Sequence, residues 1–107
     1  MGLQKIDRRR WIDVCAAISW GLRGKRAEIE VREAPRQPVL GIAYDPAIDA
    51  LTIMLDGVDH FVFNPREMYL DFALGKIQSL EILDAENAWQ IVVLRDPLRL
   101  PGASPIA

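Results

Sequence analysis

The side chains best suited to chemistry gather between residues 43 and 67. This stretch contains the only histidine of the chain, His60, and five carboxylates: Asp45, Asp49, Asp56, Asp59 and Glu67. Carboxylates and an imidazole that converge can hold a metal ion. A carboxylate can also orient an imidazole so that it acts as a general base. The stretch therefore raises a metal-site hypothesis and an acid–base hypothesis.

Turn chemistry explains most of these acids without a ligand. Asp45, Asp49 and Asp56 fall in predicted turns, where an Asp side chain can hydrogen-bond the backbone two residues further on. The calcium-loop spacing is absent, and one histidine without a nearby cysteine is a poor zinc set. We therefore predict no metal site. Asp59 and His60 remain as candidate contacts to a ligand or partner.

The cysteine and the serines form no recognisable nucleophilic motif. Cys15 lies on an apolar helical stripe, where a free cysteine behaves as a small hydrophobe. Ser19, Ser79 and Ser104 lie outside any G-x-S-x-G elbow, and "GLRG" at 21–24 matches no phosphate-binding loop. We therefore predict no catalytic residue and no cofactor.

Charge is distributed unevenly along the chain. Residues 1–36 carry nine Lys/Arg and five Asp/Glu, whereas residues 37–107 carry four and ten. The pI of about 5.3 lies well below the values above about 9 that are typical of nucleic-acid-binding domains. The basic groups Arg8–Arg10 and Arg23–Arg26 should lie at opposite ends of one helix, ~20 Å apart. We expect two basic spots and no nucleic-acid groove.

The three tryptophans divide into two core candidates and one surface candidate. Trp11 and Trp89 are expected in the core. Trp20 lies off the main apolar stripe, so it either packs under a loop or is exposed as an interface anchor. The candidate partner contacts at this end of the helix are Trp20, Arg23, Lys25 and Arg26.

One helix is predicted, at about residues 7–22. Asp7 is a suitable N-cap because its carboxylate can accept the unpaired backbone N–H groups of the first turn. Ile6 and Trp11 occupy the positions of a hydrophobic staple. The apolar stripe at helical spacing consists of Trp11, Cys15, Ile18 and Leu22.

After Gly24 the apolar pattern changes to period two, which indicates strands. Asp56-Gly57 is a strong hairpin signal between two of them. Seven strands are predicted, at about 27–33, 39–44, 50–55, 60–63, 68–73, 77–83 and 89–94. Short strands at even spacing indicate an antiparallel meander that curls into a roll or small barrel.

The predicted fold class is therefore α+β, with one N-terminal helix packed on a strongly twisted antiparallel sheet. A length of 107 residues fits a single domain, 1–107. We expect the meander at about 26–95 and an extended tail at 96–107, whose last five or so residues should be disordered.

Compartment and membrane contact can also be predicted. With one cysteine the chain can form no intramolecular disulfide. No apolar run approaches the ~20 residues of a membrane span, and the first residues lack the apolar core of a signal peptide. We expect a cytoplasmic protein without a membrane partner.

Several segments, taken in order, carry a family resemblance. "LRGKRAEIEV", "LGIAYDPAIDALTIMLDGVDHFVFNPREMYLD", "IQSLEILDAE" and "IVVLRDPLRLP" resemble the bacterial family called domain of unknown function 5335. The "YDP…DAL" and "GKIQSLEILDA" elements are also similar to domain of unknown function 2283. The resemblance implies a small, mainly β, single-domain protein and brings no established activity. The linker between Glu33 and Val39 is shorter than the family's usual one.

Three functional hypotheses follow from these features. The leading one is a non-catalytic binding or protein-interaction module, which could be a homodimer in which the basic helical end of one copy meets acidic turns of another. The second is a small enzyme or ligand-binding protein with Asp49, Asp59 and His60 as a carboxylate–imidazole group. The third is an antitoxin-like regulatory partner of another small protein.

Overall fold

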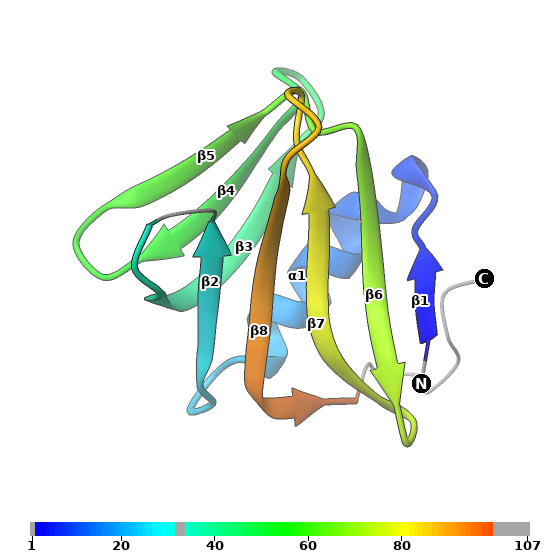
Figure 1. The fold of residues 1–107 in the computed structure, drawn as a ribbon, viewed down its shortest axis with the longest axis vertical. Helices are drawn as coiled ribbons and strands as arrows, with labels where there is room; N and C mark the ends of the chain where they lie inside the picture. The colour runs from blue at the N-terminus through cyan, green and yellow to red at the C-terminus, as the bar shows by residue number, and fades with distance from the viewer. Residues whose placement is uncertain (1, 32–33, 100–107) are drawn as a thin grey trace.

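The computed structural model describes residues 2–31 and 34–99 and has an α+β fold (Figure 1). Within these residues one α-helix accompanies eight strands of one antiparallel sheet. The helical elements are η1, a turn of 3₁₀ helix at Arg8–Arg10, and α1 at Trp11–Gly21. The strands are β1 (Gly2–Lys5), β2 (Ala27–Val31), β3 (Gln37–Asp45), β4 (Ala50–Leu55), β5 (Asp59–Phe63), β6 (Glu67–Ala73), β7 (Lys76–Leu83) and β8 (Trp89–Leu98).

The sheet has the order β1-β6-β7-β8-β2-β3-β4-β5. Two meanders, β2 to β5 and β6 to β8, are joined where β8 pairs with β2. The prediction of seven strands was wrong by one, because "GLQK" at β1 has no apolar alternation and is held as a strand only by its ladder with β6. Of the two predicted forms, a roll or a small barrel, the closed barrel is wrong. The sheet is curled but open, with β1 and β5 as its two edges.

The end of the last strand was predicted too early. We expected a tail from residue 96, but β8 continues to Leu98, which pairs with Ile77 after a register shift. Arg26 holds this part of the strand, because its carbonyl accepts hydrogen bonds from the backbone N–H groups of Arg95 and Asp96. Pro97 is tolerated because ladders are irregular at such shifts. The remaining tail, 100–107, and the predicted strand residues 32–33 lie outside the described residues.

The start of the helix follows the prediction closely. The Asp7 side chain caps the 3₁₀ turn by accepting the Arg9 backbone N–H at 2.9 Å. Ile6 and Trp11 are both buried, as the staple requires, and Trp11 Nε1–H donates to the Ile6 carbonyl at 3.0 Å. The single predicted helix is a 3₁₀ turn followed by an α-helix, which begins at Trp11.

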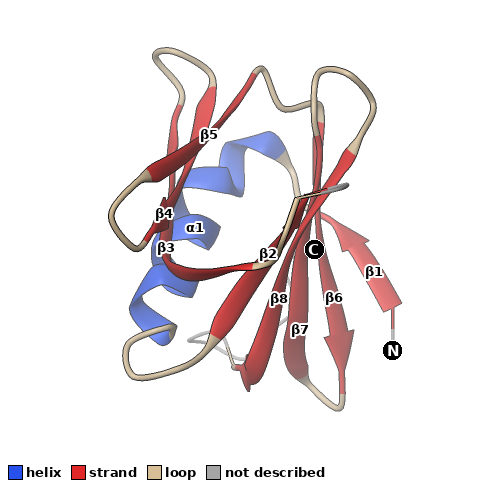
Figure 2. Cartoon of the chain, turned by 60° about the vertical axis from the view of Figure 1, so that its left-hand side comes forward, coloured by secondary structure: helices blue, strands red, loops and turns tan. Residues whose placement is uncertain are grey.

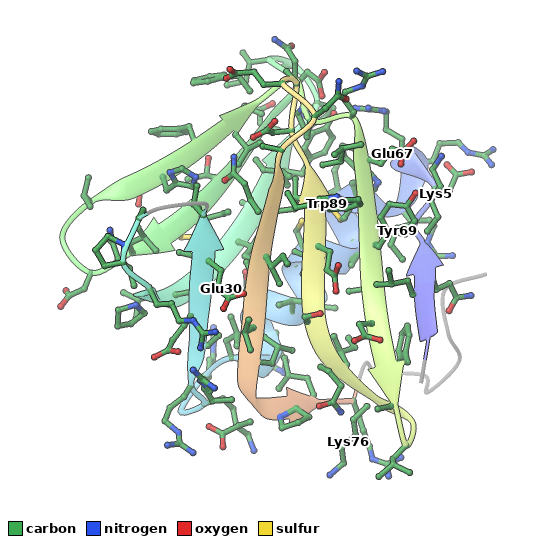
Figure 3. The ribbon with its side chains drawn as sticks, viewed as in Figure 1. Lys5, Glu30, Glu67, Tyr69, Lys76 and Trp89 are labelled. Carbon is green, nitrogen blue, oxygen red and sulfur yellow. The ribbon has the colours of Figure 1, made fainter. Side chains whose placement is uncertain are left out.

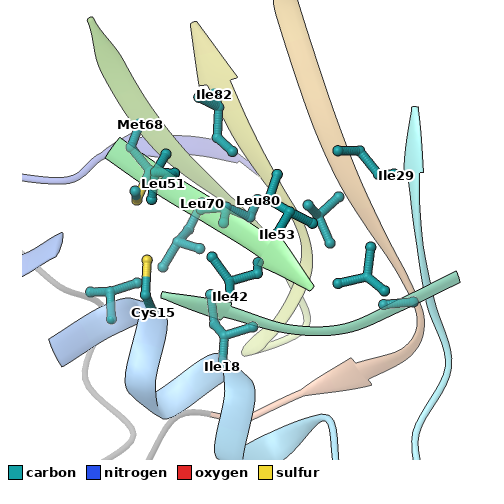
Figure 4. Close-up of a cluster of buried hydrophobic side chains, with 14 of the residues drawn as sticks. Cys15, Ile18, Ile29, Ile42, Leu51, Ile53, Met68, Leu70, Leu80 and Ile82 are labelled. Carbon is teal, nitrogen blue, oxygen red and sulfur yellow. The ribbon is translucent and has the colours of Figure 1, made fainter. Parts of the chain in front are cut away.

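The hydrophobic core lies between the concave side of the curled sheet and α1 (Figures 2 and 4). Cys15 and Ile18 of the helix meet side chains from both meanders, among them Ile42, Leu51, Ile53, Met68, Leu70, Leu80 and Ile82. Trp11 is in this core, as predicted. Trp89 is 43% exposed instead, because Gln90, Val92 and Leu94 are the residues of β8 that face inward.

The helix is attached to the sheet at the point where β2 and β3 separate. These strands share only two register pairs, Glu28↔Pro38 and Ile29↔Gln37. Further along, β3 has an unpaired edge, and Ser19 of α1 lies against it. Ser19 Oγ accepts the Ile42 backbone N–H at 2.7 Å and donates to the Ile42 carbonyl at 2.5 Å. One hydroxyl thus replaces a missing strand neighbour.

Replacing Ser19 with alanine should therefore destabilise the fold. The variant leaves the N–H and the carbonyl of Ile42 without their partner, and an unsatisfied buried polar group costs about 1–3 kcal/mol. The free energy of unfolding in urea measures this loss. The control is Ala16→Ser on the exposed side of the same helix, which should cost less than about 1 kcal/mol. Equal stability of S19A and the wild type would contradict this role.

Candidate interaction surface

Helix α1 carries a second apolar stripe on its solvent side. Its buried stripe contains Trp11, Val14, Cys15 and Ile18. Ile12, Ala16 and Trp20 are spaced four residues apart, lie on another side of the helix and are exposed. Ile12 is 49% and Trp20 is 64% exposed. Asp13 and Ser19 are the only polar side chains of the helix, so α1 is apolar on nearly all sides.

The outward face of β3, β4 and β5 also carries apolar side chains, with the exposed carboxylates Asp45 and Asp59 beside them. Along each strand, residues alternate between the core side and this outward side. Register places Ala43, Thr52 and Phe61 in one outward row across the three strands. The next row consists of Gly41, Met54 and Asp59. Phe63 lies beside Phe61, with ring centroids 5.8 Å apart, and the two rings are about half exposed.

The helical stripe and this sheet face form one surface. A Cβ placed on Gly41 would lie 3.3 Å from Ser19 Oγ and 3.1 Å from Met54 Cε, so helix and sheet are in contact at this point. Trp11 packs edge-on against Tyr44 at 5.1 Å, which shows that α1 runs antiparallel to β3. We call the combined surface the outer apolar face; it consists of Ile12, Ala16, Trp20, Gly41, Ala43, Thr52, Met54, Phe61 and Phe63.

The relief of the outer apolar face follows from its side-chain sizes. Gly41 and Ala43 are the small residues that β3 contributes; Gly41 is buried beneath the Met54 side chain, whereas Ala43 is exposed. Larger side chains lie on either side, from α1 on one flank and from β4 and β5 on the other. We call this line of small residues the β3 trough. At its Ala43 end the trough is followed by Tyr44, which lines an open pocket of about 550 Å³. The other lining residues of this pocket are Arg8, Arg9, Ile12, Pro46 and Asp49.

Charged side chains lie on both flanks of the outer apolar face. On the helical flank the Arg23 guanidinium lies over the Trp20 ring, 4.1 Å from its centroid. On the β5 flank Asp59 ends the row that begins at Gly41. In residues 2–31 and 34–99, neither Arg23 nor Asp59 has an ion-pair partner within 4 Å. The helical flank thus carries Arg23 and also the exposed Asp13, the β5 flank carries Asp59, and the exposed Asp45 of β3 lies between them.

Of the partner contacts predicted from the sequence at the end of the helix, only two lie against each other in the structure. Trp20 and Arg23 stack on each other. Arg26 instead forms an ion pair with Asp96 at 3.2 Å, and this pair lowers the pKa of the Asp96 carboxyl. Lys25 and Arg26 line a smaller open pocket of about 340 Å³ beside Leu40. From the sequence, a sheet face exposed around Trp20 or Phe61 favours a partner, and both residues are exposed. Phe63 was missed, because an outward and an inward apolar residue look alike in a sequence.

Asp59 and His60 lie on opposite faces of β5. Asp59 is on the outward side, whereas His60 shares the inward side with Val62. His60 Nε2 lies 2.6 Å from Gln90 Oε1 on β8, and Gln90 Nε2 donates to Asp84 Oδ2 at 3.0 Å. This chain of hydrogen bonds links the edge strand β5 to the other meander across the open end of the core.

The hydrogen-bond chain fixes the tautomer of His60. Because the Gln90 amide donates to a carboxylate, its carbonyl oxygen must face the imidazole, and that oxygen can only accept. We therefore expect the neutral ring to carry its proton on Nε2, as ¹H–¹⁵N NMR correlations of the ring nitrogens would show. Gln90→Leu removes the acceptor and should therefore remove the preference of the neutral His60 ring for a proton on Nε2. A ring protonated mainly on Nδ1 in the wild type would contradict this assignment.

Asp49 belongs to a separate cluster that sequence reasoning missed. Tyr44 Oη donates to Asp49 Oδ1 at 2.6 Å, and Arg8 Nη1 donates to the same oxygen at 3.0 Å. Arg8 Nη2 also donates to the Pro65 carbonyl at 2.8 Å, and its guanidinium lies over Trp11. Partial burial and the bond to Asp49 raise the pKa of Tyr44. The cluster ties the 3₁₀ turn to the end of β3.

The outward face of β6, β7 and β8 is the other broad surface of the sheet (Figure 3). Register places Lys5, Tyr69, Glu81, Ile91 and Glu30 in one row across five strands. Its charges are largely paired within the chain: Lys5 lies 3.5 Å from Glu67, and Arg36 pairs with Glu30. Trp89 packs on Tyr69, with centroids 5.7 Å apart. Most of the charged and aromatic side chains on this face thus have a partner within the chain.

Cys15 is enclosed in the core, as expected of a small hydrophobe. Burial raises the pKa of its thiol to about 12, so the thiolate is scarce at neutral pH. We expect no reaction with a thiol reagent at pH 8 in the native state and full reaction in denaturant. Absorbance of the released chromophore measures both. Rapid labelling of the folded chain would contradict the burial.

Residues 2–31 and 34–99 contain no group of three or more His, Cys, Asp or Glu side chains placed to hold a metal ion. No helix of the described segments is long and apolar enough to cross a membrane.

Comparison with known proteins places the chain in a family. It is 27% identical to an uncharacterized protein of Aquifex aeolicus (strain VF5) over 110 residues, which covers 94% of this chain and 99% of the relative. No solved structure matches the chain. The comparisons do not extend to domain of unknown function 2283, so that similarity stays a prediction. A model of the family of unknown function DUF5335 matches residues 3–103, and the chain therefore belongs to this family.

Proposed function

We propose that the protein is a non-catalytic interaction module that docks a protein partner on the outer apolar face. The observation that carries the proposal is the exposed apolar stripe of α1, which continues across β3 to Phe61 and Phe63. A helix that is apolar all round is normally buried on all sides. Contiguous exposed apolar surface of this kind usually marks an interaction site.

The residue types on the outer apolar face suit a protein partner. Trp and Arg are enriched among the residues that dominate binding energy at interfaces. Trp20 and Arg23 supply both in one stacked pair, and aromatic rings from β5 provide the opposite flank. In the β3 trough Ala43 is exposed, so a partner's side chain can approach the backbone at this residue, whereas Met54 covers Gly41. A cytoplasmic location, favoured by the single cysteine, is part of this proposal.

A ligand or enzyme site around His60 has less support. His60 faces inward and is bonded to Gln90, whereas Asp59 faces outward and Asp49 is held by Tyr44 and Arg8. The three groups therefore do not converge in this conformation. That hypothesis remains a prediction from the sequence, as does an antitoxin-like regulatory role, which would be one form of docking.

Photo-crosslinking in the cells that produce the protein tests the proposed function. Benzoylphenylalanine replaces Trp20 in one variant, Phe61 in a second and Trp89 in a third. Trp89 is the matched control, because it is a partly exposed tryptophan on the other face of the sheet. We expect discrete protein adducts from positions 20 and 61, in the same mass range, and none from position 89. Absence of adducts at 20 and 61, or the same adducts at 89, would contradict docking at this surface.

A further inference from the structure

We propose that the chain also docks on an anionic membrane surface, through the end of the molecule at which α1 finishes and β6 turns into β7. Cations surround this end, and the Leu74 side chain protrudes from it. The inference goes beyond the proposed function, because it concerns a different surface from the outer apolar face. A contact at the membrane surface requires no spanning segment. The expectation of no membrane partner was drawn from the absence of such a segment.

Three segments that are distant in the chain meet at this end (Figure 1). A Cβ placed on Gly21, the last residue of α1, would lie 3.1 Å from Leu98 Cδ1, so the helix finishes against the end of β8. Leu98 in turn pairs with Ile77, near the start of β7. Residues 22–26, 73–76 and 95–99 therefore form one end of the molecule, which we call the basic end.

The basic end carries an excess of positive charge. Its six cations are Arg23, Lys25, Arg26, Lys76, Arg95 and Arg99. The carboxylates in or within two residues of the three segments are Glu28, Asp71 and Asp96. Two of these are already paired, Asp96 with Arg26 at 3.2 Å and Glu28 with Arg95 at 2.7 Å.

Several cations of the basic end are available to a partner. Within residues 2–31 and 34–99, Lys25, Lys76 and Arg99 form no ion pair. Lys76 lies at the very end of the molecule (Figure 3). The β4–β5 turn, which carries Asp56 and Asp59, lies to one side of the basic end (Figure 1). Sequence reasoning recognised only the group at 23–26, because Lys76 and Arg99 join it through the fold.

Leu74 protrudes from the basic end in an unfavourable backbone conformation. With Gly75 it forms the two-residue turn between Ala73 and Lys76, and both have positive φ, 55° and 75°. Such a turn prefers Asn, Asp or Gly. The other non-glycine residues with positive φ in the described segments are Asp49, Asn64 and Asn87. Leu74 is thus the exception among the four, and its side chain is 95% exposed.

The fold gains nothing from a leucine at this position. The side chain covers no apolar surface of the chain, and the backbone conformation is strained for a residue of this type. Contact with an apolar phase outside the chain would offset both costs. The strain and the exposure thus point to a contact made by Leu74, and the surrounding cations indicate that its partner is anionic.

A bilayer fits this combination better than a protein or a nucleic acid. It accepts a single protruding side chain without a preformed pocket, whereas a protein partner must provide one. The three segments contain no aromatic side chain to stack on a base. Near an anionic leaflet, each Lys or Arg strengthens binding about fivefold. Leu74 would enter between the headgroups, while the long stems of Lys25 and Lys76 keep their charges at the level of the phosphates.

Co-sedimentation of the purified full chain with lipid vesicles tests the proposal. We expect binding to vesicles of phosphatidylcholine with about one-third phosphatidylglycerol to be at least about tenfold stronger than to phosphatidylcholine alone. The binding should weaken as salt is raised, because salt screens attraction between exposed charges. Equal binding to the two kinds of vesicle, or binding to neither, overturns the proposal.

Substitution of Leu74 separates binding from folding. Leu74→Asn gives the turn a residue that it prefers, so the melting temperature should equal or exceed that of the wild type. Vesicle binding should nevertheless fall about tenfold, because the apolar contact is lost. Leu74→Met keeps an apolar side chain and should retain binding to within about threefold. The matched control is Val58→Asn in the β4–β5 turn, where Val58 is 60% exposed, and it should leave binding unchanged.

Charge reversal tests the cations in the same assay. K25E and K76E should each weaken binding at least about tenfold, because each removes one attraction and adds one repulsion. R10E makes the same change in the 3₁₀ turn, a helix length of ~16 Å away. That distance exceeds the Debye length of about 10 Å, so R10E should weaken binding less than about twofold.

The contrary outcomes are distinct from those of the crosslinking experiment. The proposal fails if L74N binds anionic vesicles as tightly as the wild type, or if R10E weakens binding as much as K25E and K76E. It also fails if the chain binds duplex DNA but not the vesicles, since the basic end then takes a nucleic acid. Crosslinks at positions 20 and 61 report protein adducts on the outer apolar face, so either proposal can fail without the other.

Discussion

The contact between Ser19 and the backbone of Ile42 is the constraint on which the rest of the structure depends. The sheet can curl only because β3 separates from β2 after two register pairs, and this separation exposes an edge that needs hydrogen-bond partners. A second neighbouring strand would flatten the sheet and close the core to the helix. Ser19 instead satisfies the edge from within α1, so the helix itself continues the sheet. The core, the open edges and the outer apolar face all follow from this position.

Placing a helix at the edge of a strand determines which of its sides are solvent-exposed. A helix on top of a sheet buries one stripe and shows the opposite side to water, so the exposed side is normally polar. α1 has its core stripe on one side of Ser19 and the stripe of Ile12, Ala16 and Trp20 on the other. The second stripe is level with the outward side of β3. Its apolar character matches that of Phe61 and Phe63 on the strands beside it, so helix and strands present one surface.

The sequence pattern predicted those parts of the fold that depend on contacts between residues close together in the chain. The Asp7 cap, the staple of Ile6 and Trp11, and the bounds of β4 could be predicted because capping and alternation involve near neighbours. β1 and the last residues of β8 could not, because both are strands only through distant ladders. Alternation predicts two faces for a strand but not which face is inside. Trp89 was therefore assigned to the core, and Phe63 was not recognised as part of a surface. The cluster of Arg8, Tyr44 and Asp49 joins residues too far apart in the chain for any local pattern to predict.

The edge strand β5 carries both His60 and the exposed rings of the outer apolar face. An edge strand without lysine, proline or a bulge is open to pairing with other chains, and natural sheets normally protect such edges. In β5 the inward His60 is tied to Gln90, which holds the strand against the second meander and leaves its outward rings in a fixed position. Stacked rings of this kind lose little side-chain freedom on contact with a partner, which favours packing by the face of the strand over pairing by its edge. The histidine that first suggested chemistry then has a positional role: it sets the orientation of Phe61 and Phe63 from the other side of the strand.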